Sequence, residues 1–408
     1  MAKNIVLFID GTWQDGTGPE TTNVVKLAGH TVRDRDQVVY YIPGIGRNHT
    51  RSRQLFEGDK VTRFEIQAWA APTLLESIGV SRVAFGNLRG LGMATRIREA
   101  YAFICSEYDH RRGDRIFIFG FSRGAFAARS LCGFLDKVGT LLKDHLPLVP
   151  KAYRLYEDAR DAAASELAAF LVPFAKSGSP GSEPHPVTIH FVGAWDTVGA
   201  LGLPKRLQVF KAMRTEYHQP FVPPNVMKAR HAMAAHELRA EFQMLPWTID
   251  PDLPRGQPKP DLFQVWFAGA HGDVGGGYKA AESGLSNAAL TWMADEASQS
   301  GLRLKPNVGA AHPVSSTPIH HEIKGVYWAW LPVVRDHVCK LHEQVTSNSI
   351  QADENREYNY HATLTARFTT PQTYRFIPSV SAELERADQL IFETIMEARL
   401  KLDSQIVE

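Results

Sequence analysis

The chain has 408 residues, of which 44% are hydrophobic and 22% charged, and its formal net charge is +1. A chain of this length and composition can bury a sizeable core and is ordinary for a globular protein. The near-zero net charge gives no reason to expect nucleic acid as the main partner. The three cysteines have no metal-like spacing and cannot form a disulfide framework.

The N-terminus leads directly into an apolar run at residues 5–9, which ends at Asp10. Five apolar residues are too few for the core of a signal peptide, so we expect a first β-strand here. No apolar run approaches the roughly 20 residues that a membrane-spanning helix needs. We therefore expect a cytoplasmic protein without a transmembrane segment, unless a specialised secretion system that needs no signal peptide exports it.

Five short apolar runs are typical of β-strands, and each ends in small or polar residues: 5–9, 38–42, 115–119, 187–192 and 262–268. Most are nearly continuous in apolar residues, which favours a parallel sheet covered on both faces. Helical patterns follow at residues 97–108, after a loop marked by Gly90 and Gly92, and at 227–242 and 285–297. This alternation predicts an α/β fold, mostly parallel and α/β-hydrolase-like, with right-handed crossovers.

Two regions interrupt the alternation. Residues 141–186 combine an alanine-rich helical pattern with a turn-rich linker, and we expect a helical insertion over the sheet. From about residue 302 the strand–helix pattern fades, so residues 301–408 are expected to form a C-terminal extension packed on the core. Residues 1–300 would then form the main α/β domain.

The segment Gly120-Phe121-Ser122-Arg123-Gly124 has the pattern G-x-S-x-G between a predicted strand and a predicted helix. At such a turn the serine hydroxyl stands above the sheet, and the flanking glycines let strand and helix pass close together. The alternative is a tight turn in which Ser122 merely caps the following helix. We interpret Ser122 as a nucleophile.

A serine nucleophile needs a base that takes its proton and an acid that orients the base, in the chain order Ser, Asp or Glu, then His. Asp196 and His271 each come just after a predicted strand, where open α/β sheets carry their functional loops. Asp196 capping a turn is the alternative for that residue. Asp273 is a rival acid, although its place two residues after His271 favours a role in bracing the loop. We predict a triad of Ser122, Asp196 and His271.

The loop after the first strand, DGTWQDGTG, is predicted to support the same site. The N–H of Gly11 or Thr12 would supply one half of an oxyanion hole. The N–H of Arg123, at a helix N-terminus, would supply the other half. Asp10 is expected to order the loop, and the sequence alone does not separate these roles.

Six motifs, in order along the chain, resemble those of a bacterial α/β-hydrolase family of unknown function that contains type VI secretion phospholipase effectors: VLFIDGTWQD, TNVVKL, YIPGIG, GFSRGAFAARSLCGFL, WDTVGALG and GAHGDVGGGY. The resemblance covers roughly residues 3–300. It implies a hydrolase in which Ser122 is the nucleophile, Asp196 the acid and His271 the base. Characterised effectors of this family are lipases that act on membrane phospholipids, so the resemblance implies a lipid ester as substrate.

We therefore predict a serine hydrolase that cleaves carboxylic esters, lipid or phospholipid esters included, through an acyl-enzyme. It would need no metal or cofactor and would have no nucleic-acid partner, while peripheral contact with a membrane stays open. A weaker hypothesis assigns the arginine-rich stretch 47–53 to an anionic head group, against the alternative of a solvated loop.

Two other functions are open alternatives. A metal-dependent phosphohydrolase would use as ligands Asp10, Asp196, His271 and Asp273. The DGT motif of haloacid-dehalogenase phosphatases, however, needs a further aspartate where this chain has Phe8. The second alternative is a non-catalytic binding protein that keeps the α/β-hydrolase fold.

Overall fold

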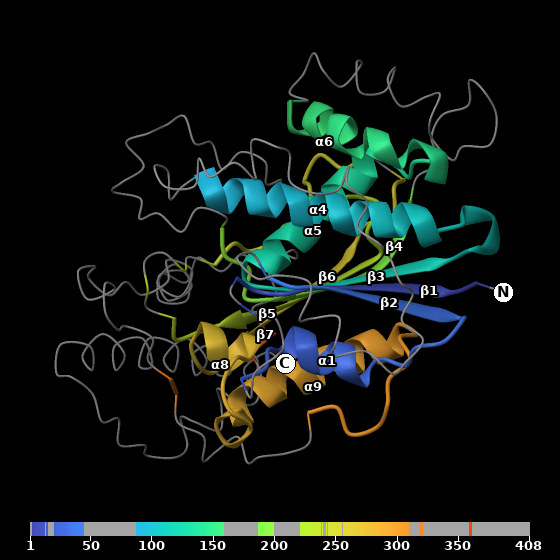
Figure 1. Cartoon of the computed structure of the whole chain (residues 1–408). Helices are drawn as coiled ribbons and strands as arrows, with labels where there is room; N and C mark the ends of the chain where they lie inside the picture. Colours follow the sequence, from blue (N-terminus) through green and yellow to red (C-terminus); the bar gives the residue numbers. More distant parts are fainter. Residues whose placement is uncertain are drawn as a thin grey trace, which may run out of the picture.

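A computed structural model describes residues 2–12, 14, 20–44, 87–158, 187–199, 221–237, 239, 242, 244–254, 256–309, 319–320 and 359–360. Within these residues the chain forms a seven-stranded sheet in the order β2-β1-β3-β4-β5-β6-β7 (Figure 1). All neighbouring strands in it are parallel. The predicted α/β class with a mostly parallel sheet is confirmed.

The strands are β1 (Asn4–Ile9), β2 (Gln37–Ile42), β3 (Arg115–Phe121), β4 (Ile189–Trp195), β5 (Lys228–Ala234), β6 (Asp261–Phe267) and β7 (Asn359–Tyr360). The α-helices are α1 (Asn23–His30), α4 (Asn87–Glu107), α5 (Arg123–Val138), α6 (Val149–Asp158), α8 (His271–Gly275) and α9 (Gly284–Gln299). Short 3-10 turns lie at η3 (His110–Arg112), η4 (Lys143–Leu148) and η7 (Ala280–Glu282). Helices α4, α5 and α6 lie on one side of the sheet, and α1, α8 and α9 lie on the other (Figure 1).

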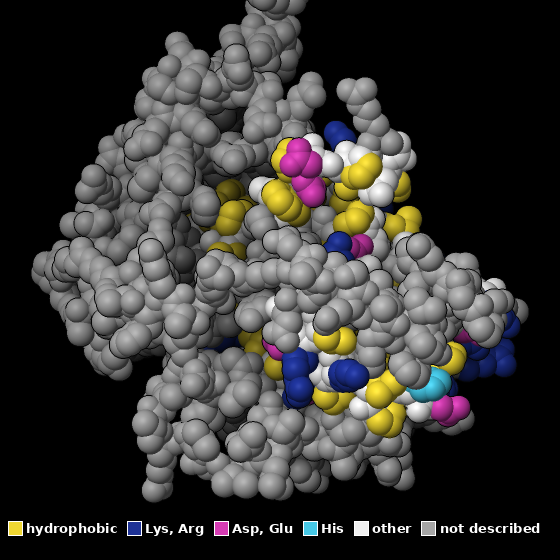
Figure 2. Space-filling view, turned by 90° about the horizontal axis from the view of Figure 1, so that it is seen from above, with side chains coloured by type: hydrophobic (Ala, Val, Ile, Leu, Met, Phe, Trp, Pro, Cys, Tyr) yellow, Lys and Arg dark blue, Asp and Glu magenta, His cyan; other side chains and the backbone are white. Residues whose placement is uncertain are grey.

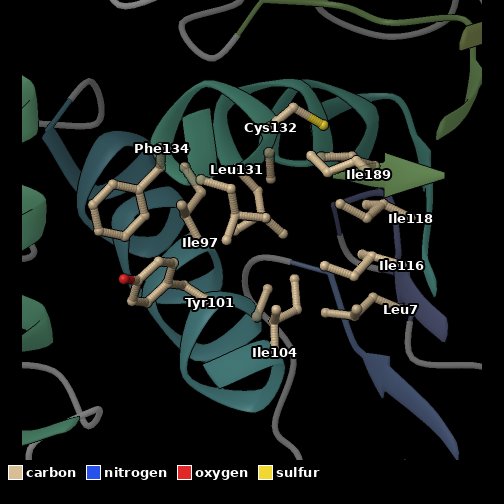
Figure 3. Close-up of a cluster of buried hydrophobic side chains, with 14 of the residues drawn as sticks. Leu7, Ile97, Tyr101, Ile104, Ile116, Ile118, Leu131, Cys132, Phe134 and Ile189 are labelled. Atoms are coloured by element: carbon tan, nitrogen blue, oxygen red, sulfur yellow. The ribbon is translucent and has the colours of Figure 1, made fainter. Parts of the chain in front are cut away.

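The near-continuous apolar strands have both faces buried, as the sequence predicts for a covered parallel sheet. In β1, Leu7 belongs to the cluster shared with α4 and α5 (Figure 3), whereas Phe8 belongs to the cluster shared with α1 and α9. Phe8 stacks on Phe119 of β3 with 5.1 Å between ring centroids. Fully burying a side chain of this size stabilises the fold by about 1.5–3 kcal/mol, so the two layers hold the central strands firmly in register.

Two local predictions are wrong. Residues 227–242 were expected to be a helix, but Lys228–Ala234 form β5, which pairs with β4 on one side and β6 on the other. The alanine-rich segment has helical propensity, and pairing along both edges of an interior strand overrides it. Gly90 and Gly92 were expected in a loop, but both lie inside α4.

Parts of the two unusual regions are described. In the region predicted as an insertion, α6 packs against α5, where the rings of Tyr153 and Phe134 meet edge to face at 5.2 Å. Residues 159–186 and the arginine-rich stretch 47–53 lie outside the described residues. In the predicted C-terminal extension, β7 adds a short strand beside β6. The division into a domain and an extension stays a prediction.

The described surface over α6 carries hydrophobic, basic and acidic side chains interspersed with one another (Figure 2). Within the described part of the chain, every helix is too short or too polar to cross a membrane.

The strand order places a topological switch point between β1 and β3. From β1 the chain moves outward to β2, and then returns to form β3 on the other side of β1. Crossovers therefore diverge at the carboxyl ends of β1 and β3, where open α/β sheets leave a crevice for ligands. Asp10 follows β1 and Ser122 follows β3, so both loops open onto this crevice.

Candidate active site

Ser122 occupies a sharp turn between β3 and α5, with φ 59° and ψ −123°. Such a conformation is strained for any residue with a side chain. A Cβ added to Gly120 would lie 2.5 Å from the Gly124 carbonyl oxygen, and one added to Gly124 would lie 2.2 Å from that of Ile9. Only glycine fits at either position because strand and helix touch through their backbones. The Ser122 side chain makes no capping bond to α5, which contradicts the helix-cap alternative.

The Ser122 hydroxyl lies against the ring of His271, at the start of α8. Its Oγ is 2.8 Å from Nε2 of His271, and Nδ1 of His271 is 2.6 Å from Oδ2 of Asp196. An ionised carboxylate only accepts hydrogen bonds, so Nδ1–H donates to Asp196 and the neutral ring leaves Nε2 as the acceptor. The Ser122 hydroxyl therefore donates to His271. The structure brings these three residues together in one buried relay.

Asp196 follows β4, beside β3, and is fully buried. Its Oδ1 accepts the N–H of Ala234 at 2.9 Å, which leaves Oδ2 for His271. Asp273 is directed elsewhere: its carboxylate accepts the N–H of Ala270 at 3.0 Å and binds Nδ1 of His320 at 2.7 Å. Of the two candidate acids, Asp196 is therefore the one that contacts the base.

Burial lowers the pKa of His271 below its ordinary value of 6.5, and this cause outweighs the hydrogen bond to Asp196, which raises it. The ring is consequently neutral at neutral pH, with a lone pair on Nε2 directed at Ser122. This is the protonation state that a general base needs.

Asp10 holds the loop after β1. Its Oδ1 accepts the N–H of Gly11 at 2.7 Å and the hydroxyl of Thr22 at 2.9 Å, and its Oδ2 accepts the hydroxyl of Tyr41 at 2.6 Å. The Gly11 N–H is thus directed at Asp10, which leaves Thr12 as the predicted donor next along this loop.

The other predicted donor lies on α5. Arg123 is the first residue of this helix, and the first N–H groups of a helix have no acceptor within it. A Cβ added to Gly11 would lie 3.5 Å from the Cβ of Ser122, so the loop after β1 runs beside the serine. The roles of Thr12 and Arg123 as oxyanion donors stay predictions.

Of the four ligands of the metal-dependent alternative, Asp196 and His271 contact each other, whereas the other two have partners outside the set. Asp10 is engaged by Gly11, and Asp273 is engaged by His320. No group of three or more His, Cys, Asp or Glu side chains in the described ranges is arranged to hold a metal ion. The phosphohydrolase alternative therefore has no ligand set in that part of the chain.

Several residues around the base are not apparent from the sequence. The rings of Phe121 and Phe242 pack against the His271 ring, with centroids at 4.6 and 4.9 Å. The backbone N–H of His271 donates to the buried carboxylate of Glu237 at 3.2 Å. Glu237 and Phe242 follow β5, in a stretch for which the sequence pattern predicts a helix. Recognising that strand would have identified this segment by the same rule that identified Asp196. Nothing in the sequence pattern pointed to His320.

Comparison with known families gives a match over residues 3–296 to the model of the T6SS phospholipase effector Tle1-like catalytic domain. The chain belongs to this family. The match spans β1 to β6 of the Tle1-like domain and includes Ser122, Asp196 and His271.

One curated relative is an uncharacterized protein of Saccharomyces cerevisiae, YEL023C. It is 31% identical over 258 residues, which are 62% of this chain and 34% of that protein. The Tle1-like chain thus spans about a third of this relative's length. Similarity to this chain therefore extends to a eukaryotic protein.

Two solved structures are also similar. A crystal structure of an uncharacterized protein from Pseudomonas aeruginosa is 16% identical, with a TM-score of 0.42, over 96% of this chain and 62% of that one. The Tle1 effector bound to the VgrG spike of the type VI secretion system is 18% identical, with a TM-score of 0.31. That match covers 70% of this chain and 53% of the effector.

Proposed function

We propose that this chain hydrolyses carboxylic esters of lipids, phospholipids included, through an acyl-enzyme formed on Ser122. The observation that carries the proposal is the relay from Ser122 through His271 to Asp196, with contacts of 2.8 and 2.6 Å. Membership of the Tle1-like phospholipase effector family supports a lipid ester as the substrate.

In the first half of the reaction, Oγ of Ser122 attacks the carbonyl carbon of the ester while its proton passes to Nε2 of His271. Asp196 holds Nδ1–H and stabilises the imidazolium that forms. The N–H groups of Thr12 and Arg123 would bind the negative oxygen of the tetrahedral intermediate. His271 then gives its proton to the leaving alcohol as the carbon–oxygen bond breaks, and the acyl group stays on Ser122.

In the second half, water replaces the alcohol. Nε2 of His271 takes a proton from the water as its oxygen attacks the acyl carbon. Collapse of the second tetrahedral intermediate returns that proton to Oγ of Ser122 and releases a carboxylic acid. The net reaction consumes one ester and one water and produces one acid and one alcohol.

Labelling and turnover together test the proposal. A fluorophosphonate probe should label the wild-type protein and leave Ser122→Ala unlabelled. A panel of p-nitrophenyl esters should be hydrolysed, with at least about a thousandfold loss in Ser122→Ala. Near-normal hydrolysis by Ser122→Ala would reject the nucleophile, and wild-type protein that neither labels nor turns over would favour a non-catalytic binding protein.

Phospholipid vesicles test the substrate class. Release of fatty acid from phosphatidylcholine or phosphatidylglycerol vesicles, dependent on Ser122, would support a phospholipid substrate. Hydrolysis of soluble esters with vesicles left intact would restrict the proposal to other lipid esters. A difference between the two vesicle types would identify a preference for head-group charge.

A further inference from the structure

Three described residues after β5, namely Glu237, Arg239 and Phe242, contact the base or one another. Glu237 is buried, and its Oε2 accepts the backbone N–H of His271 at 3.2 Å. The same carboxylate binds the guanidinium of Arg239 through two bonds of 2.8 Å, and its Oε1 also accepts the Arg239 backbone N–H. A bidentate arginine–carboxylate pair fixes the orientation of both side chains.

The guanidinium of Arg239 continues the chain of contacts to an aromatic ring. It lies 3.6 Å from the centroid of the Phe242 ring. The Phe242 ring meets the His271 ring edge to face, with 4.9 Å between the centroids. The ring of Phe121 also packs against the imidazole, with 4.6 Å between the centroids. The contacts close a circuit from the His271 backbone through Glu237, Arg239 and Phe242 to the His271 ring.

Keeping a charge pair buried is costly because both ions lose their water. Here the pair contacts the backbone of His271 and, through Phe242, its ring. The charges facing His271 are Asp196 from β4, and Glu237 and Arg239 from the segment after β5, while Asp273 lies on α8 itself. A role in orienting the imidazole of His271 would explain why the chain keeps the Glu237–Arg239 ion pair buried at this place.

We propose that Glu237, Arg239 and Phe242 form a clamp of positioning residues that holds the His271 ring in the orientation needed for proton transfer with Ser122. The clamp rests on the proposed function for its purpose, but its geometry is independent of the substrate. Its two charges also act on the base with opposite sign: Arg239 lowers the pKa of His271 and Glu237 raises it.

Single charge removals separate positioning from general stability. In Glu237→Gln the amide oxygen still accepts the His271 N–H, but Arg239 loses its counter-charge, so the acid limb of kcat/KM should move to lower pH. In Arg239→Gln it should move to higher pH. Both variants should lose about tenfold or more in kcat on a p-nitrophenyl ester, with KM nearly unchanged, because small displacements of a catalytic group cost large factors in rate.

Two further variants divide charge from stacking. Arg239→Lys keeps the positive charge, so the acid limb of kcat/KM should stay at the wild-type pH. Because lysine has no planar guanidinium to lie over Phe242, kcat should still fall. Phe242→Leu should lower kcat without moving the limb. Glu107→Gln is the matched control, because Glu107 forms an ion pair with Lys3 at 2.6 Å. Lys3 directly precedes β1, so this pair lies at the end of the sheet opposite the candidate active site. This control should leave both kcat and the limb unchanged.

The titration of His271 followed by NMR gives a readout that does not need activity, with the signal assigned by its loss in His271→Asn. Shifts of the midpoint in opposite directions in Glu237→Gln and Arg239→Gln, with native circular dichroism, support the clamp. Equal shifts, or none, overturn it even if kcat falls. If wild-type protein hydrolyses no ester, the proposed function fails, and the NMR titration still decides the clamp.

Discussion

The strained backbone at Ser122 makes a prediction about stability that is separate from activity. With φ at 59°, this position disfavours any residue with a Cβ, while glycine adopts it freely. We predict that Ser122→Gly is more stable than Ser122→Ala. Both variants lose the hydroxyl and its hydrogen bond to His271, so that loss cancels in the comparison. The backbone strain and the conformational entropy of glycine remain.

The magnitude follows from two opposing effects. Strain of this kind costs about 1–3 kcal/mol, and glycine relieves it. Glycine in turn costs about 0.5–1 kcal/mol more than alanine in conformational entropy. The difference leaves Ser122→Gly more stable than Ser122→Ala by up to about 2.5 kcal/mol, the reverse of the usual order of these residues.

Urea unfolding of both variants, followed by circular dichroism, measures this difference. Ala288→Gly in α9 is the matched control, since Ala288 is partly exposed in a regular helix and should lose about 1 kcal/mol. If Ser122→Gly is less stable than Ser122→Ala by a similar amount, the turn is not strained, and the structural argument for an activated serine loses its basis.

Four further predictions concern the base and its surroundings. Because burial lowers the pKa of His271 below 6.5, the acid limb of kcat/KM should have its midpoint below pH 6.5. By the same shift, this residue's contribution to stability is full above pH 6.5 and is lost as the pH falls towards the folded-state pKa, since the unfolded chain takes up the proton first. Asp196→Asn should keep the fold but lower kcat by about 10⁴, because the ring would no longer be held in the required tautomer. Gly275→Ala should lower kcat at least about tenfold, since its Cβ would lie 1.9 Å from the Phe121 ring that contacts His271. Gly29→Ala, with open space around it in α1, should leave activity unchanged.

Much of the fold follows from apolar runs that need burial on both faces, so β1, β3, β4 and β6 could be predicted within a few residues. The segment 228–234 could not, because KARHAMA has no continuous apolar run and its strand conformation depends on neighbours at both edges. The placement of Ser122, Asp196 and His271 was predictable because each follows a strand that the sequence makes visible. Glu237 was not predictable because it follows β5, the strand that the sequence pattern does not indicate.

The geometry of the sheet explains why His271 needs such support. Ser122 follows β3 and His271 follows β6, with β4 and β5 between them. Neighbouring strands lie about 4.8 Å apart, so three spacings separate the two chain positions by about 14 Å. A 2.8 Å contact therefore requires α8 to turn back across the ends of β5 and β4. Glu237 after β5 holds its backbone and Asp196 after β4 holds its ring, so each strand that the base crosses supplies one carboxylate to fix it.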